Sequence, residues 1–337
     1  MKEKGYKENV ISMIGNTPLI RINSLSTKDL NFYAKLEMYN PSGSLKDRSV
    51  YQMIKEAESS GELKKGMTLI EPTSGNTGIS LAMLGKQKGY EVIVVTPEFI
   101  NFERRTLIRL YGAKIIYTKS GKGIKGAIRK AKEIVRGNPD KFFCLNQYEN
   151  FGNSKGYHKA AEEIYNDMDG KIDAFVAGFG TSGTLMGIGE YLKKKDNNIK
   201  IVSAQPLPEH TLIGLKSLEN EPTPLIFDKS KIDYEIKVND KDAYEMTINL
   251  TRKEGISVGP SSGATMCAAI EYSRKIKKAN IVVLFPDGVD RYMTTMLFNK
   301  HITSLKNIIF IFKRIIIGKL RTLWLNLSKP YKNRKLY

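Results

Sequence analysis

Lys46 stands in a stretch whose residue types could hold a reactive amine in a fixed place. The stretch reads NPSGSLKDRSV and covers residues 40–50. Pro41 and Gly43 interrupt regular structure, a serine can cap the helix that follows, and Asp47 places negative charge in the first turn of that helix. We expect Lys46 at a rigid turn where a helix begins. An ordinary helix start with a surface lysine fits these residues too, so other stretches of the sequence must show whether Lys46 has a chemical role.

A second stretch, AGFGTSGT at 177–184, has the composition of a phosphate-binding loop. It follows the apolar run DAFVAG and opens a helical pattern. Its glycines let the backbone approach a ligand, its hydroxyl side chains can donate, and the free amides of a helix start favour an anion. It lacks the GK[ST] ending of a Walker loop. Taken alone, such a turn fits tight packing as well as it fits binding.

A third stretch, EPTSGNTG at 71–78, also follows an apolar run and precedes a helical pattern. Thr73, Ser74, Asn76 and Thr77 would place hydroxyls, an amide and backbone N–H groups at a helix N-terminus, which suits a carboxylate. Capping needs only one of these residues. A positioned lysine, a phosphate loop and a carboxylate site are together what pyridoxal phosphate needs to act on an amino acid.

The elements that must position these loops are short apolar runs separated by helix-length segments. The runs are MTLIEP, YEVIVVTP, AKIIYT, KIDAFVAG, IKIVSAQP and NIVVLFPDG. Strands that alternate with helices predict parallel sheets covered on both faces, with functional loops at the carboxyl ends of the strands. We predict an α/β fold of two doubly wound domains, with a division between residues 147 and 148. The first domain covers 1–147, the second covers 148–300, and a tail covers 301–337.

Composition narrows the class of protein. The chain has 337 residues, a formal net charge of +19, two cysteines and three histidines. The cysteines and histidines lack the spacing of metal ligands or of a disulfide framework, so we expect no metal. Much of the basic excess lies in 301–337 and no aromatic-basic interleaving of an RNA reader is present, so we expect no nucleic-acid partner. The N-terminus resembles no signal peptide and no long apolar run follows, which predicts a cytoplasmic protein.

With these motifs in order, the sequence resembles the cysteine synthase family, that is, O-acetylserine sulfhydrylases and the related cystathionine β-synthase core. These are fold type II pyridoxal phosphate enzymes, similar in fold to the tryptophan synthase β subunit. The resemblance runs from IGNTPLIRI at 14–22 through the three loops, NQYEN and EGISVGPSSGA to PDGVDRY at 286–292. It implies that residues 1–40 cross onto the second domain.

The resemblance implies a role for each motif residue. Lys46 would be the Schiff-base lysine and the proton carrier, and Asn76 would hydrogen-bond the ring hydroxyl of pyridoxal phosphate. Ser261 would face the pyridine nitrogen, and as a neutral group it would favour β-elimination and β-replacement over transamination. The substrate carboxylate would be held by Thr73, Ser74, Asn76, Thr77 and Gln147, and the cofactor phosphate by Gly180, Thr181, Ser182, Gly183 and Thr184.

The implied reaction is β-replacement on an O-activated L-serine, either O-acetylserine or O-phosphoserine, with sulfide to give L-cysteine. Some residues depart from the family pattern, among them Ser182 for a usual glycine and Pro260 for a usual isoleucine. An alternative is β-replacement on L-cysteine, which releases hydrogen sulfide and forms L-serine, lanthionine or cystathionine. Asp228 or Asp233 could then activate the incoming hydroxyl, although a solvated loop explains both aspartates more simply.

The tail at 301–337 lies outside the resemblance. Its apolar residues approximate one helical face and Lys306, Lys313, Arg314 and Arg321 interrupt that face, so it reads as a basic amphipathic helix. Packing against the body or a second subunit is favoured over contact with a membrane surface. A second alternative is therefore a binding protein that has kept the fold without catalysis. The resemblance also implies a homodimer, and serine acetyltransferase is a further possible partner.

Overall fold

A computed structural model describes residues 6–221 and 223–295. The chain divides after Tyr292 into two units, and the description that follows is of the first. The tail predicted over 301–337 lies outside the described residues. Within those residues, no helix combines the length and apolar character that crossing a membrane requires.

A six-stranded sheet joins both ends of the first unit. Its strands, in spatial order, are β1 (Leu19–Arg21), β2 (Leu30–Leu36), β10 (Ala279–Phe285), β7 (Ala174–Gly178), β8 (Lys200–Pro206) and β9 (Tyr234–Val238). All neighbours are parallel except β1 and β2, which are antiparallel. The N-terminal strands thus complete a sheet whose other strands come from the second half of the chain.

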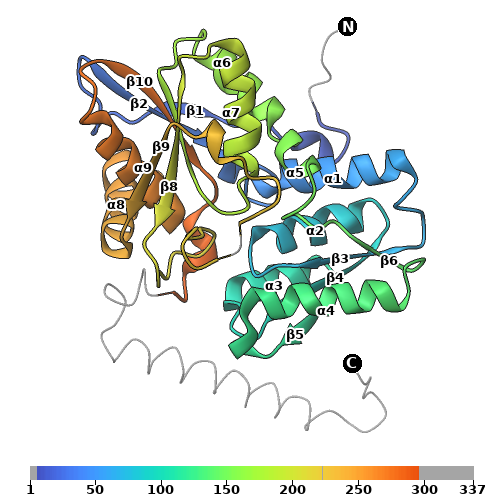
Figure 1. Ribbon diagram of the computed structural model, residues 1–337. Coiled ribbons are helices and arrows are strands. Elements are labelled where there is room, and N and C mark those ends of the chain that lie inside the picture. Colours follow the sequence, from blue (N-terminus) through green and yellow to red (C-terminus); the bar gives the residue numbers. More distant parts are fainter. Residues whose placement is uncertain (1–5, 222, 296–337) are drawn as a thin grey trace, which may run out of the picture. The chain divides into compact units, whose positions relative to one another are not determined.

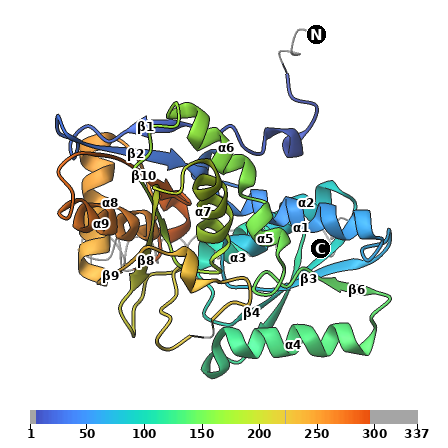
Figure 2. The ribbon, with the colours of Figure 1, turned by 45° about the horizontal axis from the view of Figure 1, so that its top comes forward.

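Helices cover both faces of this sheet (Figure 1, Figure 2). Helices α8 (Asp240–Glu254) and α9 (Pro260–Ser273) pack on one face, and α6 (His158–Asp167) and α7 (Gly183–Lys195) pack on the other. Adjacent residues of a strand point to opposite faces, so Val176 joins the first core while Phe175 joins the second. Burial on both faces explains why these strands are continuous apolar runs.

A four-stranded parallel sheet forms the other half of the unit. Its order is β5 (Lys114–Thr118), β4 (Glu91–Pro97), β3 (Thr68–Pro72) and β6 (Phe142–Cys144). One face packs on α2 (Asn76–Gln87) and α3 (Phe102–Leu110), with α1 (Lys46–Ser60) behind them, and α4 (Gly123–Gly137) covers the other face (Figure 1). The short elements are α5 (Gly152–Lys155) and the 3₁₀ turns η1 (Val10–Met13), η2 (Glu37–Tyr39), η3 (Ser120–Lys122), η4 (Lys229–Lys231) and η5 (Val289–Tyr292).

The predicted α/β class with mostly parallel sheets is confirmed. The six apolar runs read from the sequence are β3, β4, β5, β7, β8 and β10, whereas β1, β2, β6 and β9 had not been singled out. Strands β1 and β2 lie in the six-stranded sheet, although they belong to the first 40 residues. The domain boundary between residues 147 and 148 stays a prediction.

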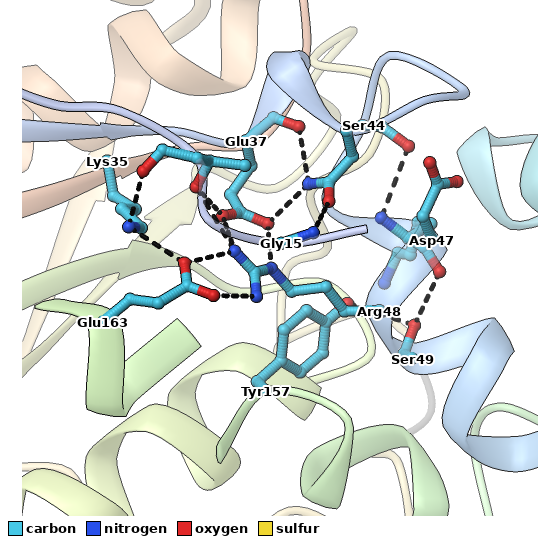
Figure 3. Close-up of polar contacts among 12 residues, drawn as sticks. Gly15, Lys35, Glu37, Ser44, Asp47, Arg48, Ser49, Tyr157 and Glu163 are labelled. Atoms are coloured by element: carbon cyan, nitrogen blue, oxygen red, sulfur yellow. Dashed lines mark hydrogen bonds and ion pairs between the residues drawn. The ribbon is translucent and has the colours of Figure 1, made fainter. Parts of the chain in front are cut away.

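A buried ionic cluster fixes the first turn of α1 (Figure 3). Arg48 is only 3% exposed. Its Nε donates to Glu37 at 2.7 Å, and its Nη2 donates to Glu163 at 2.7 Å. The Lys35 ammonium lies 3.0 Å from the same Glu163 carboxylate. This cluster joins α1 to β2, η2 and α6. Lys46, two residues before Arg48, therefore begins a helix that is held on several sides.

Candidate active site

One cavity gathers most of the residues that the sequence analysis singled out. It has a volume of about 190 Å³ and opens where β3 and β7 end and α1, α2, α7 and α9 begin. The predicted site residues that line it are Lys46, Thr73, Ser74, Asn76, Thr77, Gln147, Gly180, Thr181, Ser182, Thr184 and Ser261. Gly183 is not among the lining residues. The structure thus brings together residues from five separate segments.

Lys46 is the first residue of α1 and lines the cavity with a half-buried side chain. Its Nζ donates to the Thr181 hydroxyl at 3.3 Å. The surrounding protein removes water from the amine and lowers the pKa of Lys46 to about 8, although the Glu71 carboxylate opposes this shift. About a tenth of the amine is therefore neutral at pH 7, far more than for an ordinary lysine, and the neutral form is the one that acts as a nucleophile or base.

The loop after β7 leads directly into α7. Ser182 has a left-handed backbone with φ of 63°, and its hydroxyl donates to the Thr181 carbonyl at 2.6 Å instead of capping the helix. The first amides of α7 therefore stay available at the cavity. A side chain at Gly180 would place its Cβ 2.7 Å from the Gly214 carbonyl oxygen, so only glycine fits there. Gly183 supports this loop from outside the cavity, because its Cβ would lie 2.3 Å from Asn153 Oδ1.

The turn between β3 and α2 faces this loop across the cavity. Thr73 and Thr77 are buried, and the Thr77 hydroxyl donates to Gln147 Oε1 at 2.7 Å. The Thr73 hydroxyl accepts from the Gly75 amide at 3.1 Å. Ser74 and Asn76 complete the turn, and Arg104 donates to the Ser74 carbonyl at 3.5 Å. Hydroxyl, amide and helix-start donors are thus gathered where a carboxylate would find several partners.

Asn153, which the sequence analysis missed, connects the two loops. Its Nδ2 donates to the Gln147 carbonyl at 2.7 Å and to the Thr181 hydroxyl at 3.1 Å. It is 1% exposed, so water does not compete for these bonds. In the sequence, only its position shortly after the NQYEN motif could have marked Asn153 as a site residue. Its contacts with Gln147 and Thr181 depend on the fold.

Glu71 is a buried residue on β3, just before the turn at 73–77. It accepts from the backbone amides of Asn146 at 2.8 Å and Gln147 at 3.2 Å, where β6 has already ended. Burial raises the pKa of Glu71 to about 7, and the two amides and the Lys46 charge only partly offset this. The Glu71 side chain thus pairs with two backbone N–H groups that lie beyond the end of β6, and it holds Gln147 toward Thr77.

Ser261 lies in the first turn of α9, 4% exposed and on the cavity wall. Other lining residues were missed by the sequence analysis. Lys216 lies 3.4 Å from Glu221 and 4.6 Å from the ring centre of Tyr148, and all three line the cavity. Tyr148 belongs to the NQYEN motif, whereas Lys216 and Glu221 lie in a stretch that the sequence analysis did not single out.

The two aspartates considered for the alternative reaction lie elsewhere. Asp228 is exposed and accepts from the Ser230 amide at 3.0 Å. Asp233 pairs with Lys193 at 2.8 Å and accepts from the Ile201 amide at 2.7 Å. Neither is among the residues that line the cavity, whereas Glu221 is. Within the described chain, both aspartates therefore have structural partners away from the cavity.

The donor set fits pyridoxal phosphate. An amine with a lowered pKa can form the covalent link to an aldehyde. The uncapped start of α7 and the close backbone approach at Gly180 suit a phosphate at the same cavity. Lys46 would hold the cofactor covalently, residues 180–184 would hold its phosphate, and Asn76 and Ser261 would face its ring.

This fold and this cavity define a fold type II pyridoxal phosphate enzyme. The family model described as "Pyridoxal-phosphate dependent enzyme" matches residues 10–287. The chain is 40% identical over 303 residues to a cysteine synthase of Aquifex aeolicus, covering 87% of this chain and 93% of that protein. The structure of a cysteine synthase from Entamoeba histolytica matches with a TM-score of 0.84 and 33% identity, covering 89% of this chain and 93% of the other.

A hydrogen sulfide-producing enzyme from Fusobacterium nucleatum has a similar structure, with a TM-score of 0.81 and 38% identity over 85% of this chain and all of the other. The chain belongs to the cysteine synthase family of pyridoxal phosphate-dependent enzymes. It is accordingly an enzyme whose cofactor is pyridoxal 5′-phosphate.

Proposed function

We propose that this protein makes L-cysteine by β-replacement, in which sulfide displaces the activated oxygen of O-acetylserine or O-phosphoserine. The observation that carries the proposal is the placement of the Lys46 amine in one cavity with both the 180–184 loop and the 73–77 turn. The similarity to named cysteine synthases supports the same reaction. The atoms balance, since acetate or phosphate leaves as the sulfur is added.

The residues divide the work. When bound, the cofactor supplies an electron-withdrawing ring that takes up the electron pair released at the α-carbon of the substrate. Lys46, with its lowered pKa, takes the α-proton and later returns one. Thr73, Ser74, Asn76, Thr77 and Gln147 hold the substrate carboxylate. The hydroxyl of Ser261 leaves the ring nitrogen without a carboxylate partner, which favours replacement over transamination.

A second candidate is β-replacement on L-cysteine with release of hydrogen sulfide. The similarity to the hydrogen sulfide-producing enzyme of Fusobacterium nucleatum favours it. Glu221 is an acid on the cavity wall that could activate an incoming hydroxyl, whereas Asp228 and Asp233 do not line the cavity and Asp287, which does, already accepts from Asn76 and Tyr292. Glu221 lies 3.4 Å from the Lys216 ammonium.

We further propose that the enzyme works as a cytoplasmic homodimer and that serine acetyltransferase is a candidate partner. The family resemblance is the support for the dimer and the partner. The predicted membrane-surface contact of 301–337 is a separate proposal, tested by co-sedimentation of the full chain and a 1–300 chain with anionic vesicles. Equal sedimentation of the two chains would end it.

The visible absorbance spectrum of the purified enzyme tests the reaction. O-Acetylserine, O-phosphoserine, L-cysteine and L-serine are added separately, and sulfide follows. We expect one activated serine to change the cofactor band and sulfide to restore it, with L-cysteine as product. If only L-cysteine changes the band and sulfide is released, the second candidate replaces the first. If the cofactor binds but no amino acid changes the band, a non-catalytic binding protein is the better reading.

A further inference from the structure

The PDGVDRY segment at 286–292 lies against the loop that leads into Lys46. The Leu45 amide donates to the Pro286 carbonyl at 2.9 Å, and Ser44 and Asp287 form an antiparallel bridge. Asp287 and Arg291 are 1% and 2% exposed. These are charged side chains at the edge of the active site to which the reaction assigns no task. Burial of a charge is costly unless its partners are well placed, so their partners identify what they do.

Both side chains hold the same amide group. Asp287 Oδ2 accepts from Asn76 Nδ2 at 2.6 Å, and Arg291 Nη1 donates to Asn76 Oδ1 at 2.8 Å. If the amide were rotated by half a turn, its NH₂ would face the guanidinium and its oxygen would face the carboxylate. Both contacts would then be repulsive. The two neighbours therefore assign the orientation of the Asn76 amide.

The clamp on Asn76 is itself held rigidly. Asp287 Oδ2 also accepts from the Tyr292 hydroxyl at 2.7 Å. Arg291 Nη2 donates to the Ser42 carbonyl, so one guanidinium contacts both the loop that leads into Lys46 and Asn76 of the turn at 73–77. The Asn101 side-chain Nδ2 donates to the Arg291 carbonyl at 2.7 Å. Each partner has a second contact, which limits the freedom of the clamp to follow a rotation of Asn76.

One N–H of Asn76 is left for the cavity. An asparagine NH₂ has two donors, and Asp287 takes one of them. Among the described residues the other has no protein partner, and Asn76 lines the cavity. A donor in that position suits an oxygen acceptor on the cofactor ring.

We propose that Asp287 and Arg291 are positioning residues that lock the Asn76 amide so that its free N–H faces the ring oxygen of pyridoxal phosphate. The inference rests on the cofactor site of the proposed function and is independent of the donor substrate. The readout is taken before any amino acid is added. A failure of the cysteine-forming reaction would therefore not contradict this inference. A failure of the lock would likewise not contradict the cysteine-forming reaction.

A double-mutant cycle tests the lock. Asp287→Ala, Asn76→Ala and the double variant are prepared, and the affinity for pyridoxal phosphate and the wavelength of its visible band are measured. We expect Asp287→Ala to weaken affinity about tenfold, the loss of one hydrogen bond to a charged acceptor, and to shift the band as Asn76→Ala does. In the Asn76→Ala background, Asp287→Ala should change affinity less than twofold. Asp287→Asn keeps an acceptor oxygen and should restore most of the affinity.

Asp140→Ala is the control for the loss of a carboxylate, because Asp140 is exposed and does not line the cavity. It should leave the affinity and the band unchanged. Equal losses from Asp287→Ala in both backgrounds would show that Asp287 acts on the fold alone and would overturn the inference. So would an unchanged band in the native background. If Asp287→Ala fails to fold, Arg291→Lys repeats the cycle, because one ammonium cannot reproduce both guanidinium contacts.

Discussion

Lys46 and Thr181 lie 135 positions apart, yet the Lys46 Nζ donates a hydrogen bond of 3.3 Å to the Thr181 hydroxyl. Lys46 begins α1, and Thr181 follows β7 of the six-stranded sheet. The amine thus contacts the loop at 180–184 that leads into α7. Its hydrogen-bond partner is a neutral hydroxyl, which leaves the effect of burial on its pKa largely uncompensated.

The first prediction concerns the rate at which cofactor-free enzyme binds pyridoxal phosphate covalently. Only the neutral amine reacts with the aldehyde, and the pKa of Lys46 is lowered to about 8. The rate should therefore rise about tenfold per pH unit below pH 8 and level off above it. The rate of appearance of the visible band between pH 6 and pH 10 gives this profile. A free lysine side chain, with a pKa of about 10.4, is the reference, and a midpoint at that value would contradict the prediction.

The second prediction uses two glycines with similar backbones. Gly43 has φ of +83° and a Cβ there would lie 2.3 Å from Arg291 Nη2, whereas Gly61 has φ of +76° with nothing within 4 Å. Gly61→Ala should cost about 1–2 kcal/mol of unfolding free energy from the left-handed backbone alone. Gly43→Ala should cost about 2 kcal/mol more and weaken cofactor binding, because Arg291 must move. Urea unfolding and spectral titration measure both, and equal costs would show that Arg291 yields freely.

The third prediction concerns Glu71. Its pKa is about 7 in the folded protein against 4.5 for an ordinary glutamate, so the folded state holds a proton that the unfolded state releases between these values. This group therefore lowers the unfolding free energy as pH rises, by about 3 kcal/mol in total. Glu71→Gln has no group that releases this proton, so its unfolding free energy does not fall for this reason. The unfolding free energy of Glu71→Gln minus that of the native cofactor-free enzyme should therefore rise from pH 4.5 to pH 7.5.

Urea unfolding of both proteins across that pH range provides the measurement for Glu71. Glu62→Gln, at an exposed position, is the matched control and should show no such trend. A stability difference between Glu71→Gln and the native enzyme that is the same at every pH would mean that the fold does not shift the pKa of Glu71.

The fourth prediction concerns the Arg48 cluster. Burial alone would raise the pKa of Glu163, but the Arg48 guanidinium outweighs it and lowers the pKa to about 2. Arg48→Met leaves the Glu37 and Glu163 carboxylates facing each other without their shared cation, and should cost about 3–5 kcal/mol. Arg274→Met, which removes an exposed pair with Glu271, should cost less than about 1 kcal/mol. Similar costs for the two variants would mean that water reaches the cluster.

The sequence was sufficient for the loops and for most strands, for a physical reason. A strand buried on both faces is a continuous apolar run, and β3, β4 and β10 are such runs with turn residues at their ends. By contrast, β6 has only three residues and β9 alternates charged and apolar residues at a sheet edge. Three residues are too few to show a period, whereas the alternation in β9 is a strand signal that the sequence analysis passed over.

The contacts that orient the site residues could not be read from the sequence. Arg291 reaches Asn76 across 215 positions and the Ser42 carbonyl across 249. Glu71 was part of a recognised motif, yet its role depends on β6 ending where its carboxylate can accept from Asn146. Such contacts depend on which loops the two sheets bring together, and no local spacing encodes that.

The pairing of β2 with β10 also has a consequence for how the protein is made. During synthesis, β2 leaves the ribosome early but can pair along this edge only when residues 279–285 have followed. Pro286, which accepts from the Leu45 amide beside Lys46, emerges later still. A nascent chain therefore carries its reactive lysine while the 240 residues from 47 to 286 are added, before the loop that leads into Lys46 is fixed in place. Premature termination before residue 279 would yield a fragment without a closed cofactor site, so cofactor capture reports that synthesis has passed β10.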